Sequence, residues 1–268
     1  MKKYLSFFSM RIRAGLQYRS AVAGAVFTQL PWGMMECLAY QTFQEADPGA
    51  FPMGLSAVTA YMWLKEAFFV LFTVWGNTDQ EIFDMILKGD IAYELCRPVS
   101  IYHMWFAKVS AGRIASASLR CIPILVFASL LPEPFRFTLP EDVPCGIFFV
   151  ISMCLGIGVT VSFCMIVYVL AFFTISPNGL RMFFMSAVEF LSGSVIPIPF
   201  MPDAARKLME LLPFAGMMNA PFRIYSGDLT GVFLYRALGL QIFWLAVMVT
   251  AGKLLCKKAE QRIIIQGG

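Results

Sequence analysis

The sequence has few charged residues and almost none of the side chains that enzymes use for catalysis. Only 14% of its 268 residues are charged, and it contains a single histidine, His103. It has neither the HExxH motif of zinc proteases nor the GxxxxGK[ST] loop that binds nucleotide phosphates. We therefore expect no catalytic residue, no metal site and no cofactor in this chain.

The seven cysteines do not indicate disulfides or a metal site. They lie mostly within apolar runs and show neither CxxC spacing nor the paired spacing of secreted domains. Buried thiols are the simplest interpretation. The net charge of +4 is too small and too scattered to indicate nucleic-acid binding.

Apolar residues, by contrast, are abundant. They make up 59% of the chain, including 26 Phe and 17 Met, and the mean hydropathy is +0.70. A soluble domain of this size cannot bury so much apolar surface, and long apolar stretches with few charges indicate transmembrane helices. Helices are expected because an unclosed sheet would leave backbone groups unsatisfied in lipid.

Six stretches approach the roughly 20 apolar residues that a helix needs to cross a bilayer. They are Ala21–Phe43, Leu55–Trp75, Val109–Leu131, Val143–Thr174, Leu180–Ile196 and Val232–Leu255. The fourth is longer than one span needs, so it either bends at Gly156 and Gly158 or tilts past the bilayer. The sequence predicts an all-α polytopic membrane protein that forms one domain over residues 1–268.

The positive-inside rule gives the orientation of these spans. With the N-terminus inside, most of the 21 Lys and Arg residues fall in the inner connections and the two inner termini. Both termini and the loop between the second and third spans are therefore predicted to be cytoplasmic.

Residues 1–19 combine apolar residues at helical spacing with Lys2, Lys3, Arg11, Arg13 and Arg19. This pattern is typical of an amphipathic helix lying on the inner membrane surface, in contact with anionic lipid. The alternative is a basic flank that only fixes the topology.

Charged residues inside the predicted spans have two possible explanations. Each costs a few kcal/mol at the bilayer centre unless it is paired or faces water, so such residues serve either function or helix register. They are Glu36, Lys65, Glu66, Arg113, Arg120 and Glu189. Arg113 and Arg120 are seven residues apart on one helix face, and Glu36, Glu66 and Glu189 are candidate partners for them across helices; the sequence does not decide the pairing.

The segment Val195–Tyr225 contains five prolines, so no single helix runs through it. Asp203 is a plausible N-cap of a short helix that reaches Leu212, and Pro213 ends that helix. We interpret the segment as two short helices that re-enter the outer leaflet, where broken backbone is tolerated if protein buries it.

Two motifs identify a family. The loop IFDMILKGDIAYELCRPVS resembles a family motif with three parts in this order: a short helix, a Gly-containing turn and a Leu-x-Arg-Pro-hydrophobic-Ser stretch. The segment FLSGSVIPIPFMPDAARKLMELLPF resembles an LSG, then prolines, then a short amphipathic helix that ends in Pro-Phe. With the six spans, the chain resembles the permease subunit of ABC transporters of the ABC-2 (type V exporter) kind. It is most similar to the compact permeases of bacterial drug and xenobiotic exporters.

The resemblance implies that residues 79–100 are the cytoplasmic coupling loop, with the coupling helix at Asp79–Leu87. This helix would offer carboxylates and an apolar ridge to an ATPase, Gly89 would end it, and the Arg97-Pro98 pair would turn the chain toward the third span. The residues expected to serve coupling are Asp79, Glu81, Ile82, Phe83, Asp84, Ile86, Leu87, Gly89, Arg97 and Pro98. The alternative, a solvated connector, is disfavoured because so many of these residues are apolar.

The resemblance also implies that residues 195–225 close the outer mouth of the pathway. The expected gate residues are Phe200, Leu211, Leu212, Pro213 and Phe214, packed against the outer ends of the fifth and first spans. It further implies location in the bacterial inner membrane, a dimer with the same or a paralogous permease, and two ATPase subunits that bind ATP and Mg. The expected cargo is hydrophobic or amphipathic.

A competing hypothesis is a proton-coupled secondary transporter that uses Glu36, Glu66 and Glu189. Six spans without a visible inverted repeat are few for that class.

Overall fold

The computed structural model describes residues 2–17, 19–73, 77–140, 142–174 and 177–261, and the regular structure in these ranges is entirely helical. The α-helices are α1 (Lys2–Gly15), α2 (Arg19–Ala46), α3 (Leu55–Phe72), α4 (Asn77–Lys88), α5 (Ile91–Leu95), α6 (Ile101–Ser129), α7 (Val143–Ala171), α8 (Pro177–Leu191), α9 (Asp203–Leu211), α10 (Asn219–Tyr225) and α11 (Gly231–Glu260). Two 3-10 helices, η1 (Pro48–Ala50) and η2 (Ile198–Phe200), lie between them. The predicted all-α class is confirmed.

Within the part of the chain that the structure describes, four helices are long and apolar enough to cross a membrane: α3, α6, α7 and α11. The predicted first and fifth spans correspond to α2 and α8. Helix α2 carries Glu36 and Glu45 among its apolar residues, and α8 has 15 residues, or about 22 Å, which is short for a span. Crossing by these two helices therefore stays a prediction.

Helix α7 lies at the centre of the packing and contacts α3, α6, α10 and α11. Its sequence is apolar on all sides, as expected of a helix surrounded by others. It is one continuous helix through Gly156 and Gly158. At Gly156 a Cβ would lie 2.4 Å from the Met217 carbonyl oxygen, so glycine serves close packing against the segment before α10.

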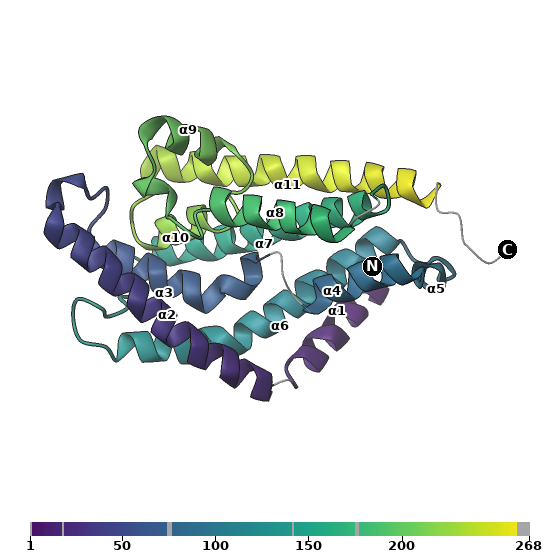
Figure 1. The fold of residues 1–268 in the computed structure, drawn as a ribbon, viewed down its shortest axis with the longest axis horizontal. Helices are drawn as coiled ribbons and strands as arrows, with labels where there is room; N and C mark the ends of the chain where they lie inside the picture. The colour runs from purple at the N-terminus through teal and green to yellow at the C-terminus, as the bar shows by residue number, and fades with distance from the viewer. Residues whose placement is uncertain (1, 18, 74–76, 141, 175–176, 262–268) are drawn as a thin grey trace.

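The molecule has two ends that differ in content (Figure 1). One end carries α4, α5, the start of α1 and the end of α11, and the opposite end carries α9, α10 and η1. Helix α1 packs along the first half of α6: Tyr4 lies near Ser100, and a Cβ on Gly15 would lie 2.8 Å from that of Ala115. Whether α1 also lies on the membrane surface stays a prediction.

Several predicted boundaries shift. Helix α6 begins at Ile101, eight residues before the predicted third span, because the side chains of Tyr102, Trp105 and Lys108 are buried against neighbouring helices. Helix α9 begins at Asp203, so Pro202 and not Asp203 is the N-cap, and it ends at Leu211. Helix α4 contains the predicted coupling helix, and Gly89 with a φ of +77° follows its end, as predicted.

Candidate functional site

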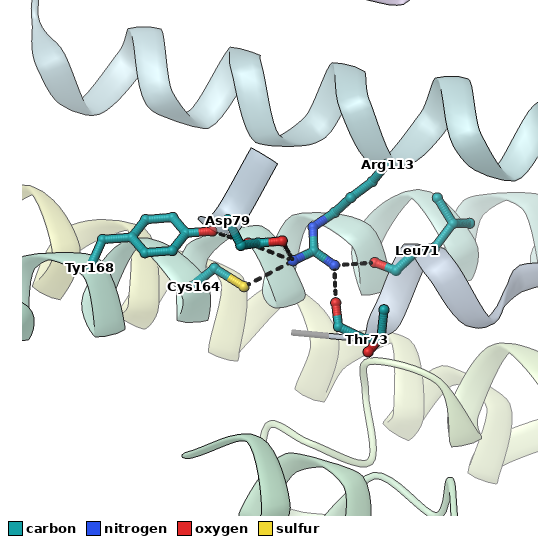
Figure 2. A network of polar contacts seen from close by, with 6 residues as sticks. All are labelled: Leu71, Thr73, Asp79, Arg113, Cys164 and Tyr168. Atoms are coloured by element: carbon teal, nitrogen blue, oxygen red, sulfur yellow. Dashed lines mark hydrogen bonds and ion pairs between the residues drawn. The ribbon is translucent and has the colours of Figure 1, made fainter. Parts of the chain in front are cut away.

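A buried polar cluster joins the start of α4 to three long helices (Figure 2). Arg113 of α6 is 4% exposed and Asp79 of α4 is 2% exposed. Arg113 Nη2 donates to both Asp79 carboxylate oxygens, at 3.0 and 3.2 Å. From α7, Tyr168 donates its hydroxyl proton to Asp79, and the Cys164 sulfur accepts from Arg113 at 3.3 Å.

The other end of the guanidinium reaches the main chain at the end of α3. Arg113 Nη1 donates to the carbonyl oxygens of Leu71, at 3.1 Å, and of Thr73. Carbonyls at a helix C-terminus have no partner within the helix, and a cation there is favourable. Asp79 in turn lies in the first turn of α4, where the helix dipole stabilises an anion. Removing one partner of such a buried pair costs about 3–5 kcal/mol.

Arg113 takes a partner that was not among the candidates from the sequence. It pairs with Asp79, not with Glu36, Glu66 or Glu189. The reason is that Asp79, assigned from the sequence to an exposed loop, is buried against α6 and α7.

The coupling helix was expected to present an exposed apolar ridge, but two residues of that ridge are buried within the chain. Ile82 and Phe83 are almost fully buried, and the Phe83 ring packs edge-on against Tyr168 with centroids 5.4 Å apart. Asp79, Ile82 and Phe83 therefore hold α4 to its own chain and do not present a surface to a partner.

The remaining coupling-loop residues form a second layer around this core. Glu81 pairs with Lys108 of α6 at 2.7 Å and with Arg11 of α1 at 3.8 Å. Arg181 of α8 donates to Gln80 and lies over the Phe83 ring, 5.6 Å from its centroid. Three helices thus reach the same short helix through ionic or polar contacts.

The part of the loop left exposed is the turn from α4 into α5. Leu87 is 52% exposed and Tyr93 is 76% exposed. Asp84 and Ile86 are half-buried, Gly89 is exposed, Arg97 pairs with Glu94 at 3.6 Å, and the Pro98 carbonyl accepts from Lys3 at 2.9 Å. We call the exposed pair Leu87 and Tyr93 the elbow.

A second ion group links α2 to α3. Lys65 donates to Glu36 and lies 3.8 Å from the Glu66 carboxylate, and it also donates to the Ser194 carbonyl at 3.2 Å. Among the described residues Arg120, their other candidate partner, does not pair with these carboxylates, because Lys65 is their cation. Glu189 lies apart in α8, where it lines a small cavity with Ser192 and Ser194.

The predicted outer gate is packed against the expected helices and also against α7 and α11. Phe200 contacts Tyr40 of α2, as expected for the first span, with ring centroids 4.9 Å apart. Leu191 at the end of α8 packs against Ile198, Met209 and Ala215 of the link, as expected for the fifth span. Phe214 packs edge-on against Phe163 of α7, and α10 lies on α7, α3 and α11. Pro213 is buried, Leu212 is half-buried, and Leu211 is 45% exposed while its carbonyl accepts from Trp244 of α11 at 2.9 Å.

Two polar anchors hold this outer link in place. Gln241 of α11 is 1% exposed and bonds Ser152 of α7 and the Gly216 carbonyl, the latter at 2.7 Å. Arg223 of α10 binds Glu210 at 2.6 Å and also Asp228. The charge of Asp228 raises the pKa of Arg223 although burial alone would lower it. The outer link is therefore an ordered cap on α7 and α11.

Sequence reasoning missed Tyr168, Cys164, Lys108, Gln241 and the elbow residue Tyr93. Within the described ranges, no group of three His, Cys, Asp or Glu side chains is placed to hold a metal ion.

The chain was also compared with known proteins. No curated protein matches it. A family described as "ABC-2 family transporter protein" matches residues 54–267, which include α3, the buried cluster, the elbow and the outer link. Because the match covers most of the chain, the protein belongs to the ABC-2 family of transporter proteins, as a membrane component.

Proposed function

We propose that this chain is the permease subunit of an ATP-driven exporter and that separate ATPase subunits, which bind ATP and Mg, drive it through the α4–α5 loop. The observation that supports this most strongly is the construction of that loop. Its helix α4 is fixed to α1, α6, α7 and α8 by buried or ionic contacts, while the elbow beyond it is left exposed. A loop of this kind can be displaced by a bound ATPase and can pass that displacement to the membrane helices.

The elbow, and not the buried ridge of α4, is the surface that we propose for the ATPase. Leu87 and Tyr93 offer exposed apolar surface at the end of the molecule that also carries the N-terminal helix. Exposed aromatic residues are frequent anchors of protein interfaces. Lys88, Asp90 and Arg97 surround them with exposed charges that suit a polar rim.

The finer points of the proposal follow from the family. The chain would lie in a bacterial inner membrane with both termini in the cytoplasm, together with a second permease, identical or paralogous, and two ATPase subunits. Its cargo would be hydrophobic or amphipathic, and the outer link would act as the gate. The proton-coupled alternative is not favoured, because Glu36 and Glu66 share Lys65 as a cation.

The test is co-purification of an ATPase subunit from cells that express the tagged chain. We expect the wild type to retain an ATPase, and the variant L87D/Y93D to lose it while its amount in the membrane is unchanged. Leu208→Asp is the matched control, because Leu208 is a 63% exposed apolar residue of α9, and α9 lies at the opposite end of the molecule. Retention of the ATPase by L87D/Y93D would refute the proposal that the elbow binds the ATPase. Absence of any ATPase with the wild type would refute the proposed function.

A further inference from the structure

The buried cluster at Arg113 meets four helices at the point where α3 is followed by α4 (Figure 2). We infer that Arg113 is the positioning residue of a joint that makes α3, α4 and α6 move as one body, so that a displacement of the loop reaches the membrane helices. This inference rests on the proposed function, because it needs an ATPase that moves the loop.

The shape of the guanidinium explains why one side chain can hold three segments. Its two terminal nitrogens point in different directions: Nη2 binds Asp79 of α4, and Nη1 binds the carbonyls of Leu71 and Thr73 at the end of α3. The planar guanidinium holds its N–H donors in fixed directions, so it fixes the relative positions of the groups that it binds. A lysine ammonium is a point charge on a flexible stem and does not. The Arg113 side chain of α6 therefore binds both the end of α3 and the start of α4.

The position of the cluster fits a joint between membrane and loop. Helix α3 is 18 residues long, or about 27 Å, so its end at Phe72 lies near one boundary of a bilayer that α3 crosses. Arg113 meets that end, and the first turns of α6, from Ile101 to Lys108, extend beyond it beside α1 and α4. A displacement of the loop would therefore act on the first turns of α6, which lie outside the bilayer.

The neighbouring ion pair between Glu81 and Lys108 cannot replace this link. Its carboxylate side chain is 47% exposed, so water can solvate Glu81 when the pair separates. The Asp79 and Arg113 side chains are 2% and 4% exposed, so separating them strands two charges away from water. The Arg113 pair is therefore the one that stays closed while the loop moves.

Tyr168 extends the joint to the central helix. Its hydroxyl binds Asp79, and its ring packs against Phe83 of α4. Tyr168→Phe keeps the ring contact and removes the hydrogen bond. We expect this variant to lower coupling less than changes at Arg113 do.

The experiment measures transport and ATP hydrolysis by the complex of the chain with its co-purified ATPase in proteoliposomes. The main variant, D79L/R113M, replaces the pair by apolar side chains of similar size, an exchange that buried pairs often tolerate without loss of fold. We expect normal membrane level and retained ATPase, but transport per ATP hydrolysed at least about tenfold lower. Arg120→Met is the matched control on the same helix, since none of the ion pairs among the described residues involves Arg120, and its ratio should be unchanged.

If D79L/R113M transports as much cargo per ATP hydrolysed as the wild type, the inference of a joint is overturned. If that variant does not accumulate, Arg113→Lys decides: it keeps the charge but cannot bind Asp79 and both carbonyls at once, so the ratio should fall, and an unchanged ratio would overturn the inference. The swapped variant D79R/R113D should fail to restore coupling, because an aspartate at 113 would face the carbonyl oxygens of Leu71 and Thr73. Full rescue by the swap would show an ordinary ion pair.

The two proposals fail in different ways. Absence of an ATPase with the wild type refutes the proposed function. A wild-type complex with ATPase whose Arg113 variants all couple normally refutes only the joint. A readout that needs no ATPase is tryptic cleavage after Lys88, at the exposed end of α4. Cleavage should be several-fold faster in D79L/R113M than in Arg120→Met, and equal rates would count against the joint.

Discussion

Gly156 offers the sharpest test of how the outer link is held. It lies in the middle of α7, and a Cβ there would stand 2.4 Å from the Met217 carbonyl oxygen and 3.1 Å from that of Gly216. Ordinary contact needs about 3.5 Å or more, so Gly156→Ala requires the main chain before α10 to move by about 1 Å. A main-chain carbonyl cannot rotate away as a side chain can.

The expected magnitude is the balance of two effects. Overpacking in a filled interior costs about 1–3 kcal/mol, and we expect the upper end here because backbone must shift. Alanine gains about 1 kcal/mol over glycine within a helix. The net loss is about 2 kcal/mol, which corresponds to a fall in Tm of about 4–8 °C for a chain of this size.

Gly239→Ala is the control that isolates the contact. Gly239 lies within α11, and a Cβ there would meet nothing within 4 Å. The propensity gain is the same in both variants, so the Tm of Gly156→Ala should lie below that of Gly239→Ala by about 6–12 °C. The assay is thermal unfolding of the purified protein in detergent. Equal Tm values for the two variants would refute the packing of the outer link against α7.

Three further predictions test other parts of the structure. Gln241→Leu should lower the free energy of unfolding by about 1–3 kcal/mol, measured as a lower Tm, because a buried donor to the Gly216 carbonyl is lost; a variant as stable as the wild type would contradict this anchor. Lys65→Met should strongly lower the amount of folded protein because Glu36 and Glu66 lose their shared cation, whereas K65M/E36Q should recover part of it; equal levels would show that the group does not matter for folding. With the exposed Cys96 and Cys154 replaced by serine, Ala46→Cys should react with an impermeant thiol reagent in intact cells and Lys258→Cys should not, and the reverse pattern would overturn the cytoplasmic placement of α11's end.

Local sequence signals predicted much of the helical layout. Apolar runs of adequate length marked α3, α7 and α11, and the glycine after Lys88 marked the end of α4 because it takes a positive φ. Prolines in the outer link correctly indicated short helices in place of one long one. These signals succeed because each depends on residues close together in the chain.

The buried cluster depended on contacts that no local signal encodes. Asp79 and Arg113 are 34 positions apart, and the loop residue Asp79 looked exposed because its burial depends on contacts with the distant helices α6 and α7. Tyr168 was missed because α7 is apolar on all sides, so no face of the helix distinguishes a functional side chain. One hint was available: an acid placed directly after one span and an arginine inside the next are each costly unless paired.

Site-specific photo-cross-linking from the elbow tests the central proposal most directly. A photoreactive amino acid replaces Tyr93 in one strain and Leu208, at the opposite end, in another, and both strains are irradiated intact. We predict an adduct from position 93 whose partner carries a GxxxxGK[ST] nucleotide-binding loop, and no such adduct from position 208. Absence of an ATPase adduct at position 93, or equal yields from both positions, would contradict the proposal that the elbow couples this permease to an ATPase.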